Sequence, residues 1–350
     1  MTPSRRKRCR NGRNRRSSAA FASIRYDGKL VDWEIGGAAV PIYQFTNLPM
    51  YQCTNSERAM KVSYFPGCTL NTTGKGFDNA VRASAAAVGL ELVELADWNC
   101  CGATFPLIVD NMLELAAPAH VLVSARDEGT SETLTTACTT CYNVLKRTNG
   151  FIRDHEEERE RLEAFIEAQY SGEIEVKDIL HVLRDDVGFD AVREKVQRPL
   201  KGLKVACYYG CMVLRPPTEV AYDDPDHPRA LDELMAALGA TPVDFPHKNE
   251  CCGAYLAVSA PDVTREMVYT ILKSAQAAGA EAVVTNCPLC QFNLDKQQAE
   301  MRKLHAGYQP VPIFYFSQLM GLALGLDVED YGWERHYIDA RPLVTRFEES

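Results

Sequence analysis

The sequence lacks the features that mark membrane-spanning, exported and dinucleotide-binding proteins. Its longest apolar run, residues 311–326, is interrupted by Ser317 and Gln318 and is shorter than the roughly 20 residues that cross a bilayer. It has neither a hydrophobic signal region nor a G-x-G-x-x-G fingerprint after a predicted strand. We therefore expect no membrane span and no NAD or flavin bound by this chain.

Positive charge is scarce after residue 59. The whole chain carries 38 Lys and Arg against 47 Asp and Glu, and residues 60–350 hold 27 against 43. A surface this acidic is unsuited to binding nucleic acid through its phosphates, so we expect no nucleic-acid partner.

Residues 1–59 differ from the remainder because they combine a basic run, Arg5 to Arg16, with no sustained periodicity. We expect a disordered or mis-annotated extension, with translation starting at Met60, where a strand opens. A twin-arginine export signal and an organelle transit peptide are the alternatives, but the apolar region expected of a signal is missing.

Cysteine is abundant, and its 13 copies follow a pattern. Ten form two matched sets, each with a Gly-Cys, a Cys-Cys-Gly and a C-x-x-C. The first set is Cys68, Cys100, Cys101, Cys138 and Cys141, and the second is Cys211, Cys251, Cys252, Cys287 and Cys290. Corresponding cysteines are offset by 143, 151 and 149 residues, which indicates an internal duplication. The odd total and the missing signal region argue against a secreted disulfide scaffold and favour a reducing cytoplasm.

Predicted strands and helices alternate from Met60 onward. The predicted strands are residues 62–65, 90–95, 133–137, 204–208, 241–245, 282–285 and 312–316, and the predicted helices are 77–88, 105–126, one from about 141, 229–238, 261–278 and 289–303. The alternation implies an α/β fold of two tandem Rossmann-like lobes, whose parallel sheets are related by the internal duplication. We place the first lobe at 60–152, a charged helical linker at 153–200, the second lobe at 201–326 and a C-terminal tail at 327–350.

The cysteines of each set follow three different predicted strands. Because the carboxyl ends of parallel strands lie at one edge of a sheet, where ligands bind in open α/β folds, we expect the five thiolates of a lobe to converge there. Helices starting just after Cys141 and Cys290 would aim free N–H groups at the sulfurs. Gly67 and Gly210 would allow the tight turns that such a site needs.

Five thiols exceed the four ligands of a tetrahedral zinc site. Iron–sulfur clusters, which take thiolates as their standard protein ligands, suit each set better. Two C-x-x-C zinc sites are the alternative, but they leave both Cys-Cys pairs unexplained. Cys207 is interpreted as a core residue, and Cys9 and Cys53 receive no role.

The paired Cys-Cys-Gly motifs, together with the strands at 64–68 and 208–211 that lead into them, resemble the CCG-domain proteins and, within them, the B subunit of heterodisulfide reductase. The resemblance covers about residues 60–325. It implies that each of the ten cysteines named above is a ligand of one of two facing noncubane 4Fe–4S clusters, which reduce a small disulfide between them to two thiols. It also implies two electron-donating partners of the heterodisulfide reductase type, the iron–sulfur C subunit and the flavin-containing A subunit.

Two other interpretations stay open. Cysteine-rich subunits of lactate, glycolate and succinate-type oxidoreductases share the motif and pass electrons to a quinone, although many carry a fused ferredoxin-like segment that this sequence lacks. A non-enzymatic scaffold or zinc-bound interaction protein is the alternative from another class.

Two basic residues near the second cysteine set are candidates for binding an anionic disulfide. Arg215 follows Cys211 by four residues, and Lys248 precedes Cys251 by three. We expect both on the rim of the second site, where charge-assisted hydrogen bonds to the substrate would form.

Overall fold

The computed structural model describes residues 34–35, 38–39, 59–103 and 112–348. Residues 1–55 and 56–350 form separate contact units. In the first unit, β1 (Glu34–Ile35) pairs antiparallel with β2 (Ala38–Ala39). The remaining expectations for residues 1–58, the predicted disorder and the roles of Cys9 and Cys53 included, lie outside the described residues.

The first lobe is a parallel sheet with the strand order β4-β3-β5-β6. Its strands are β3 (Met60–Tyr64), β4 (Leu90–Glu94), β5 (Thr133–Thr136) and β6 (Glu175–Asp178). In register, Ser63 of β3 lies opposite Val93 on one side and Leu134 on the other. The first strand is therefore central, as in doubly wound α/β folds.

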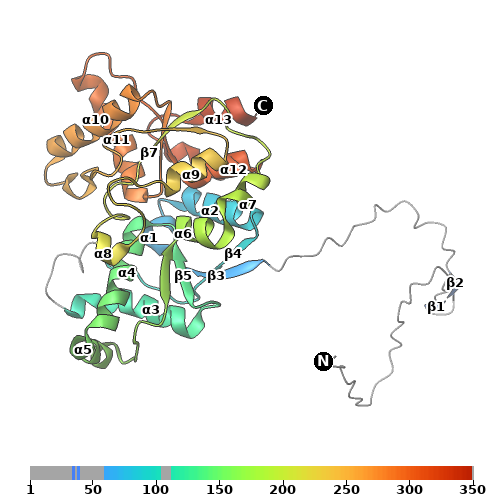
Figure 1. Cartoon of the computed structure of the whole chain (residues 1–350), viewed down its shortest axis with the longest axis vertical. Coiled ribbons are helices and arrows are strands. Elements are labelled where there is room, and N and C mark those ends of the chain that lie inside the picture. Colours follow the sequence, from blue (N-terminus) through green and yellow to red (C-terminus); the bar gives the residue numbers. More distant parts are fainter. Residues whose placement is uncertain (1–33, 36–37, 40–58, 104–111, 349–350) are drawn as a thin grey trace, which may run out of the picture. The chain divides into compact units, whose positions relative to one another are not determined.

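The second lobe repeats this order as β8-β7-β9-β10. Its strands are β7 (Lys204–Cys207), β8 (Thr241–Val243), β9 (Ala282–Thr285) and β10 (Ile313–Tyr315). All pairings are parallel. The predicted α/β fold of two lobes is confirmed, and Figure 1 shows the blue-to-green first lobe against the yellow-to-red second.

The helices predicted at 77–88, from about 141, and at 229–238, 261–278 and 289–303 are present within two residues of these bounds, whereas the helix predicted at 105–126 begins at Ala116. The helices of the first lobe are α1 (Gly67–Leu70), α2 (Lys75–Ala87), α3 (Ala116–Glu128), α4 (Thr139–Asp154), α5 (Glu156–Ile166), α6 (Ile179–His181) and α7 (Phe189–Glu194). Those of the second are α8 (Pro217–Val220), α9 (Ala230–Ala237), α10 (Pro261–Ala277), α11 (Pro288–Leu304), α12 (Phe316–Ala323) and α13 (Arg341–Glu348). In the described ranges, none of the helices combines the length and apolar character needed to cross a membrane.

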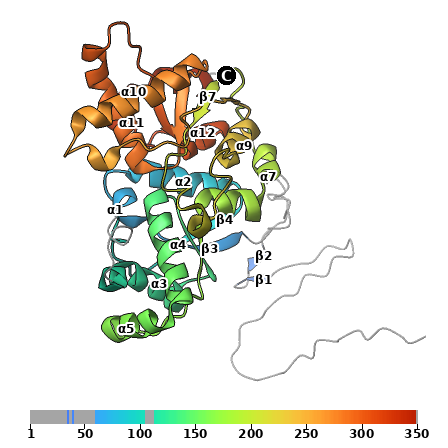
Figure 2. The ribbon, with the colours of Figure 1, turned by 60° about the vertical axis from the view of Figure 1, so that its left-hand side comes forward.

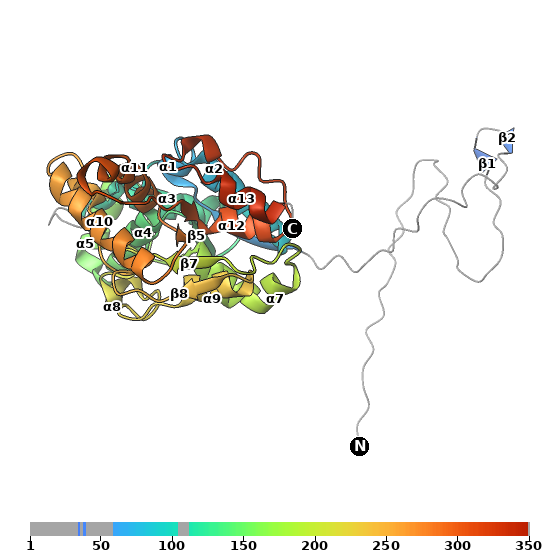
Figure 3. The same cartoon turned by 90° about the horizontal axis from the view of Figure 1, so that it is seen from above.

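Two predicted segments have a different structure. Part of the predicted linker 153–200 forms β6, which pairs with β5 through Thr133 opposite Glu175, so this segment belongs to the first sheet. A four-residue strand is too short to show a clear period in sequence. The predicted tail 327–350 contains α13 and buries Trp333 and Phe347 against the core; Figure 3 shows α13 beside α12.

Both lobes belong to one contact unit, because helices of the first lobe pack against helices of the second. In Figure 2, α2 of the first lobe lies against the second lobe. Ser84 of α2 donates to the carbonyl of Ser317 in α12 (3.3 Å), and the ring of Phe77 stacks on Tyr315 with centroids 4.1 Å apart. Tyr142 of α4 donates its hydroxyl to the carbonyl of Val220 in α8 (2.8 Å).

Candidate metal centre

The first cysteine set lies at the carboxyl edge of the first sheet. Cys68 is in α1 after β3, Cys100 and Cys101 follow β4, and Cys138 is the N-cap of α4, which also carries Cys141. The Sγ atoms of Cys101 and Cys141 are 3.4 Å apart, and those of Cys68 and Cys100 are 3.8 Å apart. Cys68 and Cys100 are exposed and the other three are buried.

The second set repeats this arrangement. The Sγ atoms of Cys252 and Cys290 are 3.5 Å apart. Cys287 is the N-cap of α11, and its Sγ accepts the backbone N–H of Cys290 (3.4 Å), while Gly253 N–H donates to Cys251 Sγ (3.3 Å). The helix N-terminus and these N–H groups stabilise thiolates. The helices begin just after Cys138 and Cys287, three residues before the predicted starts just after Cys141 and Cys290, so Cys141 and Cys290 lie within the first helical turn.

A glycine at the same position of each site lets the backbone approach a buried sulfur. Gly67 has φ +71°, and a Cβ there would lie 2.9 Å from Cys141 Sγ. Gly210 has φ +66°, and a Cβ there would lie 3.2 Å from Cys290 Sγ. Both positions need glycine for its conformation and for its missing side chain.

Each site pairs a thiol of lowered pKa with one of raised pKa. The hydrogen bond shared with Cys141 lowers the pKa of Cys101 to about 7, and the one shared with Cys211 lowers the pKa of Cys251 to about 6. The same hydrogen bonds raise the pKa values of Cys141 and Cys211, and burial adds to both rises. Since metals bind thiolates, Cys101 and Cys251 release less proton on becoming ligands than Cys141 and Cys211 do.

Groups of both lobes influence the same side chains at the lobe boundary. The pKa of the Cys287 thiol is lowered to about 7 by the hydrogen bond shared with Cys290 and, further, by Thr139, which follows Cys138 in the other lobe. Burial raises the pKa of Tyr315, and the charges of Cys287 and Cys138 add to that rise. One tyrosine is thus within electrostatic reach of both sites.

The donor chemistry fits iron–sulfur clusters, since both sites offer only soft thiol ligands, five in each. The sulfur atoms lie in close pairs, Cys68 with Cys100, Cys101 with Cys141 and Cys252 with Cys290. In the described part of the chain, no group of three or more His, Cys, Asp or Glu side chains is arranged to hold a metal ion. The predicted convergence is therefore partial in this conformation, and the roles of the ten cysteines as ligands remain a proposal.

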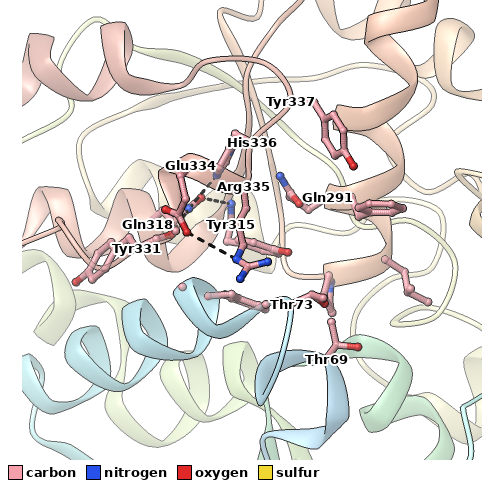
Figure 4. Close-up of a pocket in the computed structure, with 17 residues that line it drawn as sticks. Thr69, Thr73, Gln291, Tyr315, Gln318, Tyr331, Glu334, Arg335, His336 and Tyr337 are labelled. Atoms are coloured by element: carbon pink, nitrogen blue, oxygen red, sulfur yellow. Dashed lines mark hydrogen bonds and ion pairs between the residues drawn. The ribbon is translucent and has the colours of Figure 1, made fainter.

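A cavity of about 650 Å³ lies at the boundary of the two lobes, and Figure 4 shows the residues that line it. Thr69, the neighbour of Cys68, lines it from the first lobe, and Leu289, between Cys287 and Cys290, lines it from the second. From the C-terminal segment, Tyr331, Gly332 and residues 334–337 complete its wall. The cavity is within the usual size range of small-molecule sites.

The cavity lining carries little net charge. Its charged side chains are Arg335 and Glu334, which pair at 3.7 Å. Burial lowers the pKa of His336 to about 4, so its ring is neutral at pH 7. At the mouth, the rings of Phe292 and Tyr337 meet edge to face with centroids 6.0 Å apart and are 45% and 51% exposed.

The substrate role of Arg215 and Lys248 stays a prediction, since both already have acidic partners. Arg215 pairs with the exposed Asp226 at 3.6 Å, and Lys248 Nζ lies 3.2 Å from Asp232 and 3.3 Å from Asp244. Neither is among the residues that line the cavity. Cys207 is fully buried on β7, which fits the predicted core role.

Sequence reasoning missed the cavity wall after residue 326. The clearest signal was the cluster of aromatic residues Tyr331, Trp333 and Tyr337, which is unusual for a solvated tail. Arg335 and His336 lie between them and line the cavity.

A family model described as a cysteine-rich domain (CCG) matches the chain twice, over residues 62–146 and 205–295. The chain is 33% identical over 284 residues to the 8-methylmenaquinol:fumarate reductase membrane anchor subunit of Wolinella succinogenes, covering 80% of this chain and 98% of that protein. It is 28% identical over 284 residues to the B subunit of the ferredoxin/F420H2-dependent CoB-CoM heterodisulfide reductase of Methanosarcina acetivorans. That match covers 79% of this chain and 94% of that protein.

A third relative, from Archaeoglobus profundus, is a protein described as similar to the B subunit of heterodisulfide reductase; it is 29% identical over 280 residues, covering 77% of this chain and 92% of that one. Among solved structures, a hypothetical protein from Helicobacter pylori is similar with a TM-score of 0.62 and 12% identity. That match covers 80% of this chain and 52% of the other, so this chain spans about half of that protein's length, and the likeness shows the fold alone.

Proposed function

Because the chain belongs to the cysteine-rich CCG domain family, we propose that its two five-cysteine sites each hold a 4Fe–4S cluster and that it reduces a small disulfide as the iron–sulfur subunit of an oxidoreductase complex. The first cluster would be held by Cys68, Cys100, Cys101, Cys138 and Cys141, and the second by Cys211, Cys251, Cys252, Cys287 and Cys290. When bound, the clusters would supply single electrons at two facing positions.

The observation that carries this proposal is a cavity lined by residues that neighbour cysteines of both sets in the chain. Splitting a disulfide into two thiols takes two electrons and two protons, so a substrate between two one-electron centres can receive one electron from each. Thr69, which follows Cys68, lines the cavity from the first lobe, and Leu289, between Cys287 and Cys290, lines it from the second. The aromatic wall of Phe77 and Tyr315 would exclude water from the bound sulfurs.

A second candidate is electron exchange with a quinone. The little net charge of the cavity favours an uncharged substrate over a strongly anionic disulfide. The relative from Wolinella succinogenes, named for 8-methylmenaquinol, points in the same direction. In this case the chain would pass electrons between a quinone and a catalytic partner.

The proposed complex contains partners that bring or take electrons. For disulfide reduction, these would be an iron–sulfur C subunit and a flavin-containing A subunit, in the cytoplasm. Relatives named as subunits of heterodisulfide reductases support the expectation of a complex.

The test is to purify the chain anaerobically and to measure iron, acid-labile sulfide and zinc. Two 4Fe–4S clusters give eight irons per chain, and a noncubane cluster gives an electron paramagnetic resonance signal unlike that of a cubane. One or two zinc ions without sulfide would refute the cluster proposal. Reductive turnover of a disulfide, compared with that of a naphthoquinone under the same artificial electron donor, decides between the two candidate functions.

A further inference from the structure

Tyr315 brings a phenol to the carboxyl edge of the second sheet, where ligands bind in open α/β folds. It is the last residue of β10, and it lines the cavity. Figure 4 shows its side chain extending into the cavity, with the hydroxyl at the far end. The residue is 8% exposed, and the fold does not enclose its hydroxyl oxygen completely. A molecule in the cavity can therefore reach this hydroxyl.

Contacts from both lobes hold the phenol in place. The ring of Tyr315 stacks on Phe77 of α2, with centroids 4.1 Å apart and an angle of 4° between the ring planes. Its backbone N–H donates to Gln318 Oε1 of α12 (2.9 Å). Because the side chain is positioned before a ligand binds, a hydrogen bond from its hydroxyl costs little additional ordering.

The hydroxyl of Tyr315 has no acceptor for its proton among the described residues. The two amides that line the same cavity are already engaged. Gln291 Nε2 donates to the carbonyl of Ile313 (3.4 Å), and Gln318 Nε2 donates to the carbonyl of Tyr331 (2.9 Å). Burial raises the pKa of Tyr315, so the phenol keeps its proton at pH 7. Tyr315 thus presents a protonated donor to the cavity.

We propose that the hydroxyl of Tyr315 donates the hydrogen bond that binds and orients the molecule reduced in this cavity, through an acceptor oxygen on that molecule. This inference rests on the proposed function of the cavity. The acceptor is an oxygen because sulfur accepts hydrogen bonds only weakly. A carbonyl, carboxylate or sulfonate group offers such an oxygen, and negative charge that develops on a carbonyl during reduction strengthens the bond.

Two sources of the oxygen fit this chemistry, and the experiment separates them. The probes are 2-methyl-1,4-naphthoquinone, which offers carbonyl oxygens, and the symmetric disulfide of 2-mercaptoethanesulfonate, which offers sulfonates. The dissociation constant of each is measured calorimetrically with oxidised, cluster-loaded protein, so the readout does not depend on turnover. The infrared stretching band of the bound carbonyl or sulfonate group reports the hydrogen bond directly.

The key variant is Tyr315→Phe, which removes the hydroxyl and keeps the ring that stacks on Phe77. We expect it to raise the dissociation constant of the bound probe about tenfold, the effect of one lost hydrogen bond of about 1.4 kcal/mol. The infrared band of the bound group should lie at a lower wavenumber in the unchanged protein than in Tyr315→Phe. Iron content should be equal in the two proteins.

The matched control is Tyr331→Phe. Tyr331 also lines the cavity, but its hydroxyl is enclosed by the fold and lies against Gly321 of α12. A molecule in the cavity does not reach that oxygen, so the dissociation constant should stay within about twofold of the unchanged protein, well below the effect of one hydrogen bond. The pair of variants thus separates a hydroxyl that faces the cavity from one that does not.

Unchanged binding in Tyr315→Phe with full iron content would overturn the inference while leaving the proposed function in place. Equal losses in Tyr315→Phe and Tyr331→Phe, or failure of both probes to bind to the cluster-loaded unchanged protein, would also overturn it. If Tyr315→Phe does not fold, a crystal structure of the unchanged protein with the bound probe decides. An acceptor oxygen about 2.5–3.0 Å from Tyr315 Oη supports the inference, and a more distant one contradicts it.

The proposed function can fail separately, since purified protein without iron and sulfide would overturn it. In that case a tenfold loss of naphthoquinone binding in Tyr315→Phe would still support the donor role of the hydroxyl. Any other result with the cluster-free protein would overturn both the proposed function and the inference.

Discussion

The two lobes carry the same donor sets but enclose them differently. Cys68 and Cys100 of the first lobe are exposed, whereas their counterparts Cys211 and Cys251 are half-buried. In the second lobe the loop before Cys211 is tied to the loop before Cys251, since the backbone N–H groups of Tyr209 and Gly210 donate to the carbonyl of Lys248 at 2.8 and 3.2 Å.

A single residue difference between the lobes adds a further hydrogen bond between these two loops of the second site. The aromatic residue two positions before the turn glycine is Phe65 in the first lobe and Tyr208 in the second. The hydroxyl of Tyr208 donates to the carbonyl of Glu250 (2.6 Å), which no phenylalanine can do. The comparison teaches that a duplicated ligand set can keep its chemistry while its exposure to solvent diverges.

The strongest test of the comparison removes one ligand of the second site. Cys252→Ser should lose the second cluster and keep the first, because the two sites are built on separate sheets. Iron per chain should fall by about half, as measured on anaerobically purified protein. Cys101→Ser is the matched variant in the first lobe, and loss of all iron in either would show that the sites assemble together.

Alanine at the turn glycine should disturb the first cysteine site more than the second. Gly67→Ala places a Cβ 2.9 Å from Cys141 Sγ, and Gly210→Ala places one 3.2 Å from Cys290 Sγ. Both substitutions strain a positive φ, so both should lower iron content, and Gly67→Ala should lower it more. Equal iron in both variants and the unchanged protein would mean that the backbone moves freely at these turns.

A buried acid on α11 should give the second lobe a pH-dependent stability that the matching position of the first lobe lacks. Burial raises the pKa of Asp295 from 3.8 to about 6, whereas the matching position of the first lobe is Lys146. A raised folded pKa means that the contribution is fully present below about pH 3.8 and is lost as the pH rises through about 6, about 3 kcal/mol in all.

Asp295→Asn should remove this dependence, since an amide does not titrate. The difference in unfolding free energy between Asp295→Asn and the unchanged protein, measured in urea from pH 4 to pH 8, should move in favour of the variant as the pH rises. A difference that is constant with pH would show that the carboxyl keeps an ordinary pKa.

Different exposure should also give different rates of iron loss. A chelator reaches Cys68 and Cys100 more easily than Cys211 and Cys251, so about half of the iron should leave faster than the rest. The variants Cys252→Ser and Cys101→Ser identify which phase belongs to which site. A single rate for all of the iron would show that the solvent exposure of the thiols does not control release.

The smallest expected effect concerns the rim of the second site. Arg215 is 50% exposed, and its partner Asp226 is 75% exposed, so the pair is weak and the guanidinium is able to contact an anionic disulfide. Arg215→Ala should raise the apparent KM for such a substrate by up to about tenfold with no change in iron. An unchanged KM would leave Arg215 with its ion pair alone.

The sequence by itself determined the duplicated α/β architecture and the two five-cysteine sets. Both follow from local signals, since strand and helix periods are readable over short windows and cysteine spacings recur at nearly constant offsets. The positions of Gly67 and Gly210 also followed from the tight turns that a thiolate site requires.

Only the tertiary structure decided what surrounds the thiols. The strand β6 and the cavity wall at 331–337 depend on pairing partners distant in sequence, such as Asp295 with Tyr337 and Gln318 with His336. These contacts leave no periodic trace, because a buried polar side chain is placed by the partners that satisfy its hydrogen bonds rather than by the residues next to it.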